Sequence, residues 1–348
     1  MILVTGGGSG GHFYPGLAAA EALLRTGAVV MYVGAEGGLE ARLLPQSGLP
    51  YKLIPAGKLS REALRPGEGL KVIKGLWQAR KILNELKPKA VLSTGGFAGF
   101  PLAFTAELRG IPVVVHEQNA RPGLAVRWLM PRARRIALAV PVDLPKHLAS
   151  KACVVGMPVR EEHREKQAAK IALGLDKNKP VILVLGGSQG SVELNTNLPA
   201  KLAPLLKDYQ VLHQTGAHWE QGMRAKYTHT PGYQVTGYLD TTLAWGAAEF
   251  AITRAGAATL AEAAFHQVPL LVIPLPKSLD GGAQHANAKF YAGRGAVLML
   301  EHGYDSFDEA IRPLLDPARR AEMKKQLALL SPEKAAGRLA KLVLEVAA

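Results

Sequence analysis

The chain has 348 residues, 48% of them hydrophobic, with one cysteine and a formal net charge of +14. This length predicts two globular domains, and a single cysteine excludes an internal disulfide framework and fits a reducing compartment. The charge predicts an acidic partner; because aromatic residues are only 6% and no nucleic-acid-binding signature is present, a phosphate-bearing substrate or an anionic lipid surface is favoured over nucleic acid.

The first sixteen residues predict a strand, a glycine loop and the start of a helix. Such a loop directs backbone N–H groups and the positive end of a helix dipole toward one point, which predicts an anionic ligand such as a diphosphate. Gly6, Gly8 and Gly11 also match the dinucleotide-binding fingerprint, with Glu36 as its ribose acid, but that match alone is weak. Because glycines begin at residue 6, no secretory signal is expected, and the glycine-broken stretch 90–106 predicts no membrane span.

Strand and helix patterns alternate through the first half, which predicts a parallel α/β sheet. A helix is expected over residues 71–87, with its apolar face formed by Val72, Leu76, Ala79, Leu83 and Leu86. Off that face lie two apolar residues and three cations: Ile73, Trp77, Lys74, Arg80 and Lys81. An apolar tip in a basic ring fits a peripheral membrane anchor, and packing of Trp77 against a neighbouring loop fits equally well.

Two further segments place polar groups where strands end. A strand at 90–94 leads into a second glycine loop at 95–101, and a strand at 111–115 ends in the sequence His-Glu-Gln-Asn at 116–119. Open α/β sheets bind ligands at the carboxyl ends of their strands. These residues therefore belong to a candidate site.

The opening pattern repeats in the second half, where a strand at 181–185 leads into a third glycine loop at 186–191. A charged run at 161–170, expected to be a solvated helix, separates the two halves. The sequence predicts an α/β protein of two Rossmann-like domains facing a cleft, residues 1–157 and 158–331. A helix over 332–346, within a C-terminal segment 332–348, is expected to cross back onto the first domain.

Five motifs in order make a specific resemblance. They are Gly-Gly-x-Gly-Gly-His-x-x-Pro-Gly at 7–16, His-Glu-Gln-Asn at 116–119, Pro-Val-Arg at 158–160, Gly-Gly-Ser-Gln-Gly at 186–190 and Arg-x-Gly-Ala-x-Thr-x-x-Glu at 254–262. The chain resembles the MurG family of bacterial transferases over essentially its whole length. That family has the two-domain GT-B glycosyltransferase fold and moves N-acetylglucosamine from UDP-N-acetylglucosamine to the undecaprenyl-diphosphate-linked muramoyl-pentapeptide precursor of peptidoglycan.

The resemblance implies a first domain for the acceptor and the membrane and a second domain for the UDP-sugar. It implies that Ser9, Gly10 and Gly11 lie at the donor-diphosphate side of the cleft, with Asn119 and Arg160 nearby and Ser188 at the phosphates, and that Tyr238 and Leu239 lie at the uracil. The diphosphate and ribose would be followed by Gly256, Ala257, Ala258, Thr259, Leu260 and Ala261, with Glu262 on the ribose and Gln284 on the sugar hydroxyls. As alternatives, Glu262 is an ordinary solvated acid and Gln284 a surface amide. The chain departs from the commoner family pattern at Ser9, Met157, Thr241 and 280–283.

His12 is the expected general base, because histidine titrates near neutrality and this one follows the glycine loop directly. Its alternatives are a phosphate contact and a local hydrogen bond, and Glu117 is the next candidate for the base. No Asp-x-Asp occurs in the sequence, so an inverting transfer without metal or cofactor is expected, with helix N-termini and Arg160 or Arg254 stabilising the leaving diphosphate.

Three other functions compete with this interpretation. A UDP-N-acetylglucosamine 2-epimerase shares the two-domain fold, but the first glycine loop together with residues 95–101 disfavours it. A nicotinamide dehydrogenase leaves the second glycine-loop domain unexplained. A non-catalytic binder of membranes or nucleic acid explains the charge but not the site residues. We expect a peripheral enzyme at the cytoplasmic face of the membrane.

Overall fold

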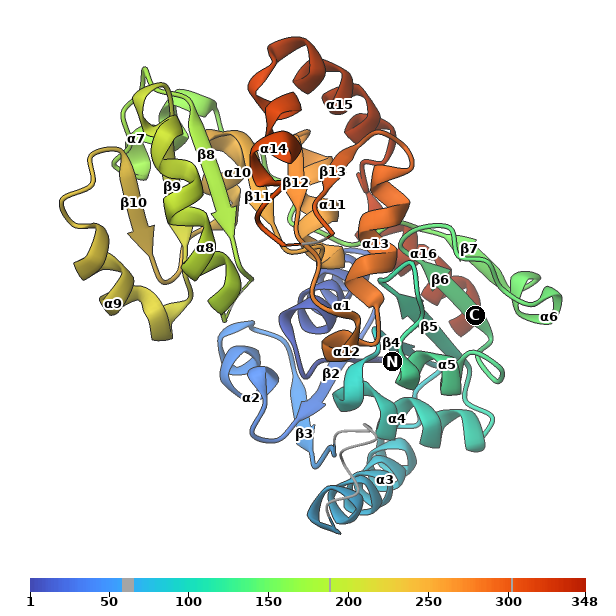
Figure 1. Ribbon diagram of the computed structural model, residues 1–348. Helices are drawn as coiled ribbons and strands as arrows, with labels where there is room; N and C mark the ends of the chain where they lie inside the picture. The colour runs from blue at the N-terminus through green and yellow to red at the C-terminus, as the bar shows by residue number, and fades with distance from the viewer. Residues whose placement is uncertain (58–65, 188, 302) are drawn as a thin grey trace. The chain divides into compact units, whose positions relative to one another are not determined.

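The computed structural model describes residues 1–57, 66–187, 189–301 and 303–348, and the chain divides into two compact units. Unit 1 comprises Met1–Val159 and Pro332–Ala348, and unit 2 comprises Arg160–Ser331. Each unit is built on one twisted parallel β-sheet with helices packed against it (Figure 1). The predicted fold class, two Rossmann-like α/β domains, is confirmed.

Unit 1 has a seven-stranded sheet in the order β3-β2-β1-β4-β5-β6-β7. Its strands are β1 (Ile2–Thr5), β2 (Val30–Ala35), β3 (Tyr51–Ile54), β4 (Ala90–Ser93), β5 (Val113–Glu117), β6 (Arg135–Leu138) and β7 (Ala152–Val154). Its helices are α1 (Gly10–Arg25), α2 (Leu39–Leu43), α3 (Pro66–Leu86), α4 (Gly96–Leu108), α5 (Leu124–Leu129), α6 (Lys146–Ala149) and α16 (Ala335–Ala347), with a 3-10 turn at Leu44–Gln46. All of the strand pairs are parallel.

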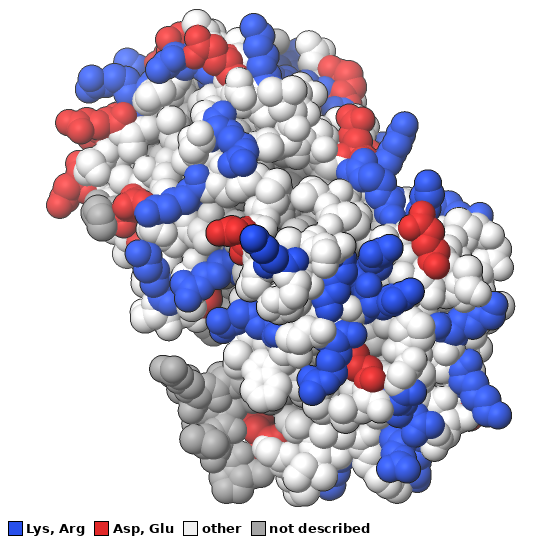
Figure 2. Space-filling view, turned by 90° about the vertical axis from the view of Figure 1, so that its right-hand side faces the viewer, with Lys and Arg blue, Asp and Glu red and all other residues white. Residues whose placement is uncertain are grey.

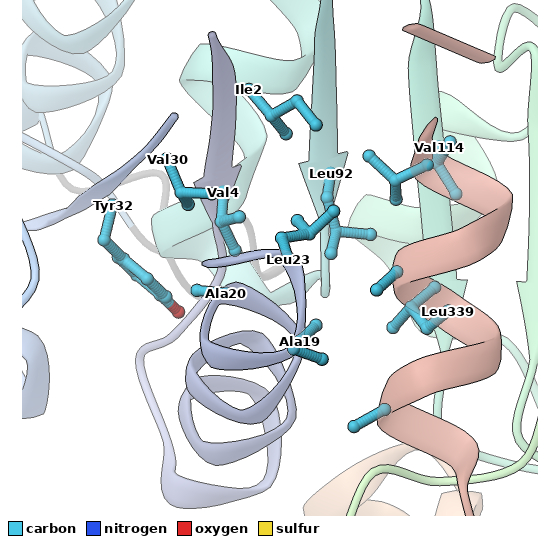
Figure 3. Packing of buried hydrophobic residues seen from close by; sticks show 14 of the residues in the cluster. Ile2, Val4, Ala19, Ala20, Leu23, Val30, Tyr32, Leu92, Val114 and Leu339 are labelled. Carbon is cyan, nitrogen blue, oxygen red and sulfur yellow. The ribbon is translucent and has the colours of Figure 1, made fainter. Parts of the chain in front are cut away.

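The alternation of side chains along β1 builds two cores, one on each face of the sheet. Ile2 and Val4 point into a cluster shared with α1 and α16, and Leu3 points into a second cluster shared with α3, α4 and α5. Figure 3 shows the first cluster, with Leu23 of α1 and Leu339 of α16 directed toward the strands. Both faces of the sheet are therefore covered, as a parallel sheet requires.

The C-terminal segment completes unit 1. Helix α16 packs against α1 and against β4, β5 and β6, and its residues Leu339 and Val343 are fully buried there. Arg338 Nε donates a 2.8 Å hydrogen bond to the carbonyl oxygen of Val155, just before the chain leaves the unit. The helix was predicted to begin at residue 332, but it begins at Ala335, three residues later. The backbone of Lys334 is left-handed (φ 59°), so the right-handed helix starts only after this residue.

Unit 2 has a six-stranded parallel sheet in the order β10-β9-β8-β11-β12-β13. Its strands are β8 (Val181–Leu185), β9 (Gln210–Gln214), β10 (Tyr233–Thr236), β11 (Ala248–Thr253), β12 (Leu270–Val272) and β13 (Val297–Met299). Its helices are α7 (Lys166–Ala172), α8 (Val192–Leu202), α9 (Ala217–Tyr227), α10 (Thr241–Ala247), α11 (Ala257–His266), α12 (Lys277–Asp280), α13 (Ala283–Ala292), α14 (Phe307–Leu315) and α15 (Pro317–Leu329), with a 3-10 turn at Ala203–Lys207.

The expected solvated helix over 161–170 is shorter than predicted. Glu165 is the N-cap of α7, and its carboxylate accepts hydrogen bonds from the backbone N–H groups of Gln167 and Ala168. A side chain that binds these N–H groups starts the helix at the next residue. Residues 161–165 are therefore not helical.

Both sheets share one strand order, in which the direction of winding reverses between β1 and β4 in unit 1 and between β8 and β11 in unit 2. This reversal, the topological switch point, separates the loops that follow the two strands and so opens a crevice for a ligand. The glycine loop at 6–9 and the polar loop at 254–256 both lie at switch points.

Candidate active site

The two glycine loops of unit 1 are packed together at its switch point. Gly96 has φ +73°, and a Cβ there would lie 2.0 Å from the carbonyl oxygen of Gly7, so no other residue fits without a backbone shift. The N–H of Gly7 donates to the carbonyl oxygen of Gly95 at 3.3 Å. The N–H of Gly8 donates to the buried carboxylate of Glu40. Two amides of the first loop are thus used inside the protein.

The donors that remain for an anion are those of the first turn of α1. Ser9 is the N-cap in extended conformation, and the N–H groups of Gly10 and Gly11 have no acceptor within the helix. The first turn carries no acidic residue. A phosphate is therefore favoured at residues 9–11 by both N–H donors and the helix dipole.

A pocket of about 340 Å³ opens beside this turn and is lined by Gly7, Gly8, Ser9, His12, Gly96, Phe97, Gly123, Leu124, Ala125 and Val126. Among these residues His12 is the titratable one, and the hydrogen-bond partners of its ring lie at Nδ1. Its Nδ1 lies 3.0 Å from the carbonyl oxygen of Thr94 and 3.0 Å from Oε1 of Gln118. Among the described residues, no hydrogen bond to Nε2 of His12 is found.

Glu117, the second candidate base, is bound on both carboxylate oxygens. Oε1 accepts from the backbone and side-chain amides of Asn119 at 2.8 and 3.1 Å, and Oε2 accepts from the N–H of Gly123 at 2.9 Å. Burial raises the pKa of Glu117, and these hydrogen bonds act in the opposite direction. This arrangement favours Glu117 as the residue that shapes the loop at 118–123.

In unit 2, Arg254 ties together the loops at the switch point. Nε and one Nη donate to Oγ of Ser191 at 3.1 and 2.9 Å, the other Nη donates to the carbonyl oxygen of Ile273 at 2.9 Å, and the guanidinium pairs with Glu193 at 2.5 Å. The residue is only 7% exposed. Its donors face protein acceptors, so the structure favours an organising role for Arg254 over direct contact with a diphosphate.

Arg160 is placed differently. It is exposed, and its guanidinium pairs with Glu162 at 2.6 Å and with Asp240 at 3.6 Å. Asp240 caps α10 directly after Tyr238, which is 73% exposed, and Leu239, which is buried. Arg160 therefore lies beside the segment that carries Tyr238 and Leu239, and surface ion pairs of this kind are weak enough to be exchanged for a ligand.

Helix α11 begins directly after the polar loop of the switch point. Gly256 is its N-cap, no acid occurs in its first turn, and Ala257, Ala258 and Thr259 are partly exposed, whereas Leu260 and Ala261 are buried. Glu262 follows one turn later, and its Oε2 accepts a 2.8 Å hydrogen bond from Nε1 of the buried Trp245. Burial raises the pKa of Glu262, and the bond to Trp245 opposes that shift. Glu262 is not a freely solvated helix acid.

Gln284 lies in the first turn of α13, next to the same loop. Its Oε1 accepts from the N–H groups of Ala255 at 3.2 Å and Leu275 at 3.1 Å. This fixes the amide so that Nε2 is the end able to donate to a ligand. Asn287 holds the loop from the same helix, donating to the carbonyl oxygen of Ala255 at 3.1 Å.

One predicted site residue, Ser188, lies outside the described residues. The described part of the chain contains no group of three or more His, Cys, Asp or Glu side chains arranged to hold a metal ion. Sequence reasoning gave no individual role to Thr94, Gln118, Ser191 or Trp245, all of which contact predicted site residues. Gln118 and Ser191 stand inside or next to the quoted motifs, whereas nothing in the sequence pairs Trp245 with Glu262.

Comparison with known proteins identifies the family. Residues 2–138 match the glycosyltransferase family 28 N-terminal domain and residues 181–339 match the family 28 C-terminal domain. The chain is 53% identical over 346 residues, 99% of each chain, to UDP-N-acetylglucosamine–N-acetylmuramyl-(pentapeptide) pyrophosphoryl-undecaprenol N-acetylglucosamine transferase of Thermus thermophilus. It is 37% identical to the Deinococcus radiodurans protein of the same name, covering 99% of this chain and 95% of that one.

Among solved structures, the crystal structure of Acinetobacter baumannii MurG superposes with a TM-score of 0.80 at 28% identity, over 99% of both chains. A glycosyltransferase of kitacinnamycin superposes with a TM-score of 0.71 at 18% identity, over 99% of this chain and 98% of that one, and shares the fold. The predicted resemblance is therefore confirmed. The chain belongs to glycosyltransferase family 28 and, within it, to the MurG family of N-acetylglucosaminyltransferases.

Proposed function

We propose that this chain transfers N-acetylglucosamine from UDP-N-acetylglucosamine to the lipid-linked muramoyl-pentapeptide precursor, with inversion at the anomeric carbon, in peptidoglycan synthesis. The observation that carries the proposal is the 53% identity to the Thermus thermophilus transferase across 99% of both chains. The related epimerase function is not favoured, because the matched relatives are transferases.

In the proposed mechanism, Nε2 of His12 takes the proton of the acceptor hydroxyl as its oxygen bonds to the anomeric carbon. The bond between that carbon and the diphosphate oxygen breaks on the opposite face, and UDP leaves with the electron pair. Support comes from the position of His12 on a pocket wall, with Nδ1 facing two acceptors and Nε2 without a partner among the described residues.

Unit 2 supplies the donor contacts in this proposal. The first-turn N–H groups of α11 and the exposed guanidinium of Arg160 bind the diphosphate, and Glu262 accepts from the ribose hydroxyls. Preorganised N–H donors stabilise charge as it develops on the leaving group. Arg254 acts indirectly by holding Ser191 and the strand ends in place.

The test is an assay of the purified chain with UDP-N-acetylglucosamine, with and without the lipid-linked acceptor. We expect UDP to be released and the disaccharide lipid to form only when the acceptor is present. Conversion of the donor to its 2-epimer in the absence of acceptor would instead identify an epimerase.

The same assay run with excess EDTA tests the expectation of metal-independent transfer, which derives from the absence of an Asp-x-Asp sequence. Turnover is expected to persist, because helix N-termini each contribute about 0.3–1 kcal/mol toward anion stabilisation and more when partly buried. A complete loss of activity that added Mg²⁺ or Mn²⁺ restores would contradict this expectation.

We further propose that the enzyme acts as a peripheral protein on the anionic cytoplasmic leaflet through α3. No helix in the described ranges is long and apolar enough to cross a membrane. On α3, Ile73 is 65% and Trp77 58% exposed, and Leu70, one turn earlier and 52% exposed, extends the same stripe. Lys74, Arg80 and Lys81 flank it, with Nζ of Lys81 3.5 Å above the Trp77 ring.

The surface charge supports this proposal. The net charge is +14, and Figure 2 shows Lys and Arg side chains spread over the face in view, interspersed with Asp and Glu side chains. A cation near an anionic membrane contributes about 1 kcal/mol. The stripe and the charge together fit an interfacial helix.

A further inference from the structure

A chain of hydrogen bonds runs from the backbone of Gly156 to the ring of His12. Nε2 of His116 lies 3.0 Å from the carbonyl oxygen of Gly156. Nδ1 of His116 lies 3.2 Å from Nε2 of Gln118, and Oε1 of Gln118 lies 3.0 Å from Nδ1 of His12. His116 and Gln118 are buried, with 0% and 3% of their surface exposed.

The direction of each hydrogen bond in this chain is fixed by its first member. A carbonyl oxygen only accepts, so Nε2 of His116 carries a proton and donates to Gly156. Burial lowers the pKa of His116 to about 4, so its ring is neutral near pH 7 and Nδ1 is an acceptor. Gln118 must therefore present its NH₂ group to His116.

Two further contacts fix the same amide orientation. Nε2 of Gln118 also lies 2.6 Å from the carbonyl oxygen of Thr94 and 3.2 Å from that of His116. A reversed amide would set its oxygen against two carbonyl oxygens and a ring lone pair. Oε1 therefore faces His12, and a lone pair on Nδ1 of His12 would meet two oxygens, those of Gln118 and Thr94.

We propose that Gln118, oriented by His116, is a positioning residue that holds His12 in the tautomer with the proton on Nδ1, so that Nε2 keeps the lone pair that accepts the substrate proton. The inference deepens the proposed function and rests on it for its catalytic consequence. The tautomer itself is a property of the free protein and is measurable without substrate.

The first measurement is a long-range ¹H–¹⁵N correlation spectrum of the histidine side chains in the full chain, recorded at alkaline pH and assigned with His12→Asn. We expect His12 to show a protonated Nδ1 and a bare Nε2. A proton on Nε2 would overturn the inference in the parent protein, with no variant needed.

The second measurement repeats the spectrum on Gln118→Leu, and on Gln118→Asn in case the leucine variant does not fold. Both remove or withdraw one of the two acceptors of Nδ1–H and leave the carbonyl oxygen of Thr94 alone, so we expect the Nε2–H tautomer to become detectable beside the Nδ1–H form. Gln210→Leu is the matched control, since Gln210 is another buried glutamine that bonds to loop backbone groups at Asp176 and Lys179 in unit 2. An unchanged tautomer in folded Gln118→Leu or Gln118→Asn would overturn the role of Gln118.

Kinetics then separate the positioning role of Gln118 from the role of His12 as the general base. Gln118→Leu should lower kcat roughly tenfold, the fold-change that corresponds to about 1.4 kcal/mol, with KM for the donor nearly unchanged. If the tautomer shifts in the Gln118 variant but kcat stays normal, Gln118 does position His12, but His12 is not the general base. A large rise in donor KM with unchanged kcat would overturn the catalytic consequence of the positioning.

Discussion

At the scale of single residues, the imidazole of His12 is the group on which the proposed chemistry depends. His12→Ala should lower kcat by roughly 10²–10⁴-fold while the KM for UDP-N-acetylglucosamine changes little, because a base acts on the acceptor proton and not on the donor. The acidic limb of the pH profile of kcat should disappear with the imidazole. Steady-state kinetics over pH 5–9, with circular dichroism as a check of folding, measure both effects.

Two other outcomes would reassign His12. Weakened donor binding with kcat retained would indicate a contact with phosphate. A near-normal kcat and donor KM would pass the base role to another group, although Glu117 has both oxygens bound to the amides of Asn119 and Gly123.

Glu262 is the second residue whose role can be isolated. If its carboxylate accepts from the ribose, Glu262→Ala should weaken UDP binding by roughly 1.5–3 kcal/mol, the range for hydrogen bonds to a charged group. Calorimetric titration of UDP measures this. Glu322→Ala, which removes an exposed carboxylate on α15, is the matched control. Unchanged affinity in Glu262→Ala would place the carboxylate outside the donor site.

Trp245 gives a finer test of the same contact. Trp245→Phe keeps most of the buried volume but removes the Nε1–H that holds Oε2 of Glu262. We expect a smaller loss of UDP affinity, about 0.5–1.5 kcal/mol, because one neutral donor is lost while the carboxylate remains. An effect as large as that of Glu262→Ala would point to collapse of the pocket.

The motifs predicted which residues belong to the candidate site but not how they are held. His12 is identified by its place after the glycines, yet its partners Thr94 and Gln118 lie 82 and 106 positions away along the chain. The same limit applies to Gly8, whose N–H is taken by Glu40 from 32 positions away. Contacts of this kind depend on tertiary packing, which no local pattern encodes.

At the scale of elements, α3 carries the proposed membrane contact. Ile73→Ser combined with Trp77→Ser should reduce binding to vesicles of anionic phospholipid severalfold or more, since each fully buried apolar side chain contributes roughly 1.5–3 kcal/mol. Co-sedimentation with vesicles at low and physiological salt measures this. Binding should also fall as salt rises, because the cations beside the stripe are screened.

A matched control uses apolar residues that are equally exposed on another element. Ile171 on α7 is 65% exposed and Leu329 on α15 is 79% exposed, and both belong to unit 2. Ile171→Ser with Leu329→Ser should leave vesicle binding unchanged. Equal loss in both double variants would indicate a general effect of surface hydrophobicity and contradict a role specific to α3.

The buried face of a helix was predicted best where the sequence carries an apolar stripe. On the predicted apolar face of α3, Ala79 and Leu83 are buried and Val72, Leu76 and Leu86 are partly buried, while Ile73 and Trp77 are exposed; the helix itself begins at Pro66, five residues before the predicted start. The charged run before α7 carries no such stripe, so its helix boundary depends on the cap at Glu165, which the sequence did not reveal. Periodicity predicts a buried face, whereas capping sets the ends.

At the scale of the whole molecule, buried histidines make stability depend on pH. Burial lowers the pKa of both His116 and His213 to about 4, below the ordinary value of about 6.5 expected in the unfolded chain. Between these values the unfolded chain binds protons that the folded chain does not. The free energy of unfolding should therefore fall as the pH is lowered from about 6.5 to 4, by up to about 3 kcal/mol for each imidazole.

Urea unfolding at a series of pH values checks this prediction. His213→Gln removes one of the two groups while keeping an acceptor for the hydroxyl of Tyr233, 2.8 Å from Nδ1 in the parent chain. The variant should lose part of the slope between pH 6.5 and 4. A slope identical to that of the parent would show that His213 does not contribute.

The fold was predictable because several signals agree along the whole chain. Apolar strands, glycine loops and amphipathic helices repeat in both halves, and this consistency selects a parallel α/β sheet in each. The strand orders, β3-β2-β1-β4-β5-β6-β7 and β10-β9-β8-β11-β12-β13, follow from no single stretch of sequence. They arise from how each crossover packs, and it is the strand order that places the loops of the site.

The return of α16 to unit 1 has a consequence for biosynthesis. On the ribosome, unit 2 is a continuous segment, Arg160–Ser331, and is fully translated before α16 appears. Until then, the strands and α1 expose the apolar surface that Leu339 and Val343 later cover. Unit 1, whose translation begins first, is therefore the second unit to be completed. During translation of the intervening 172 residues, numbers 160 to 331, the nascent chain exposes an apolar surface that chaperones can bind.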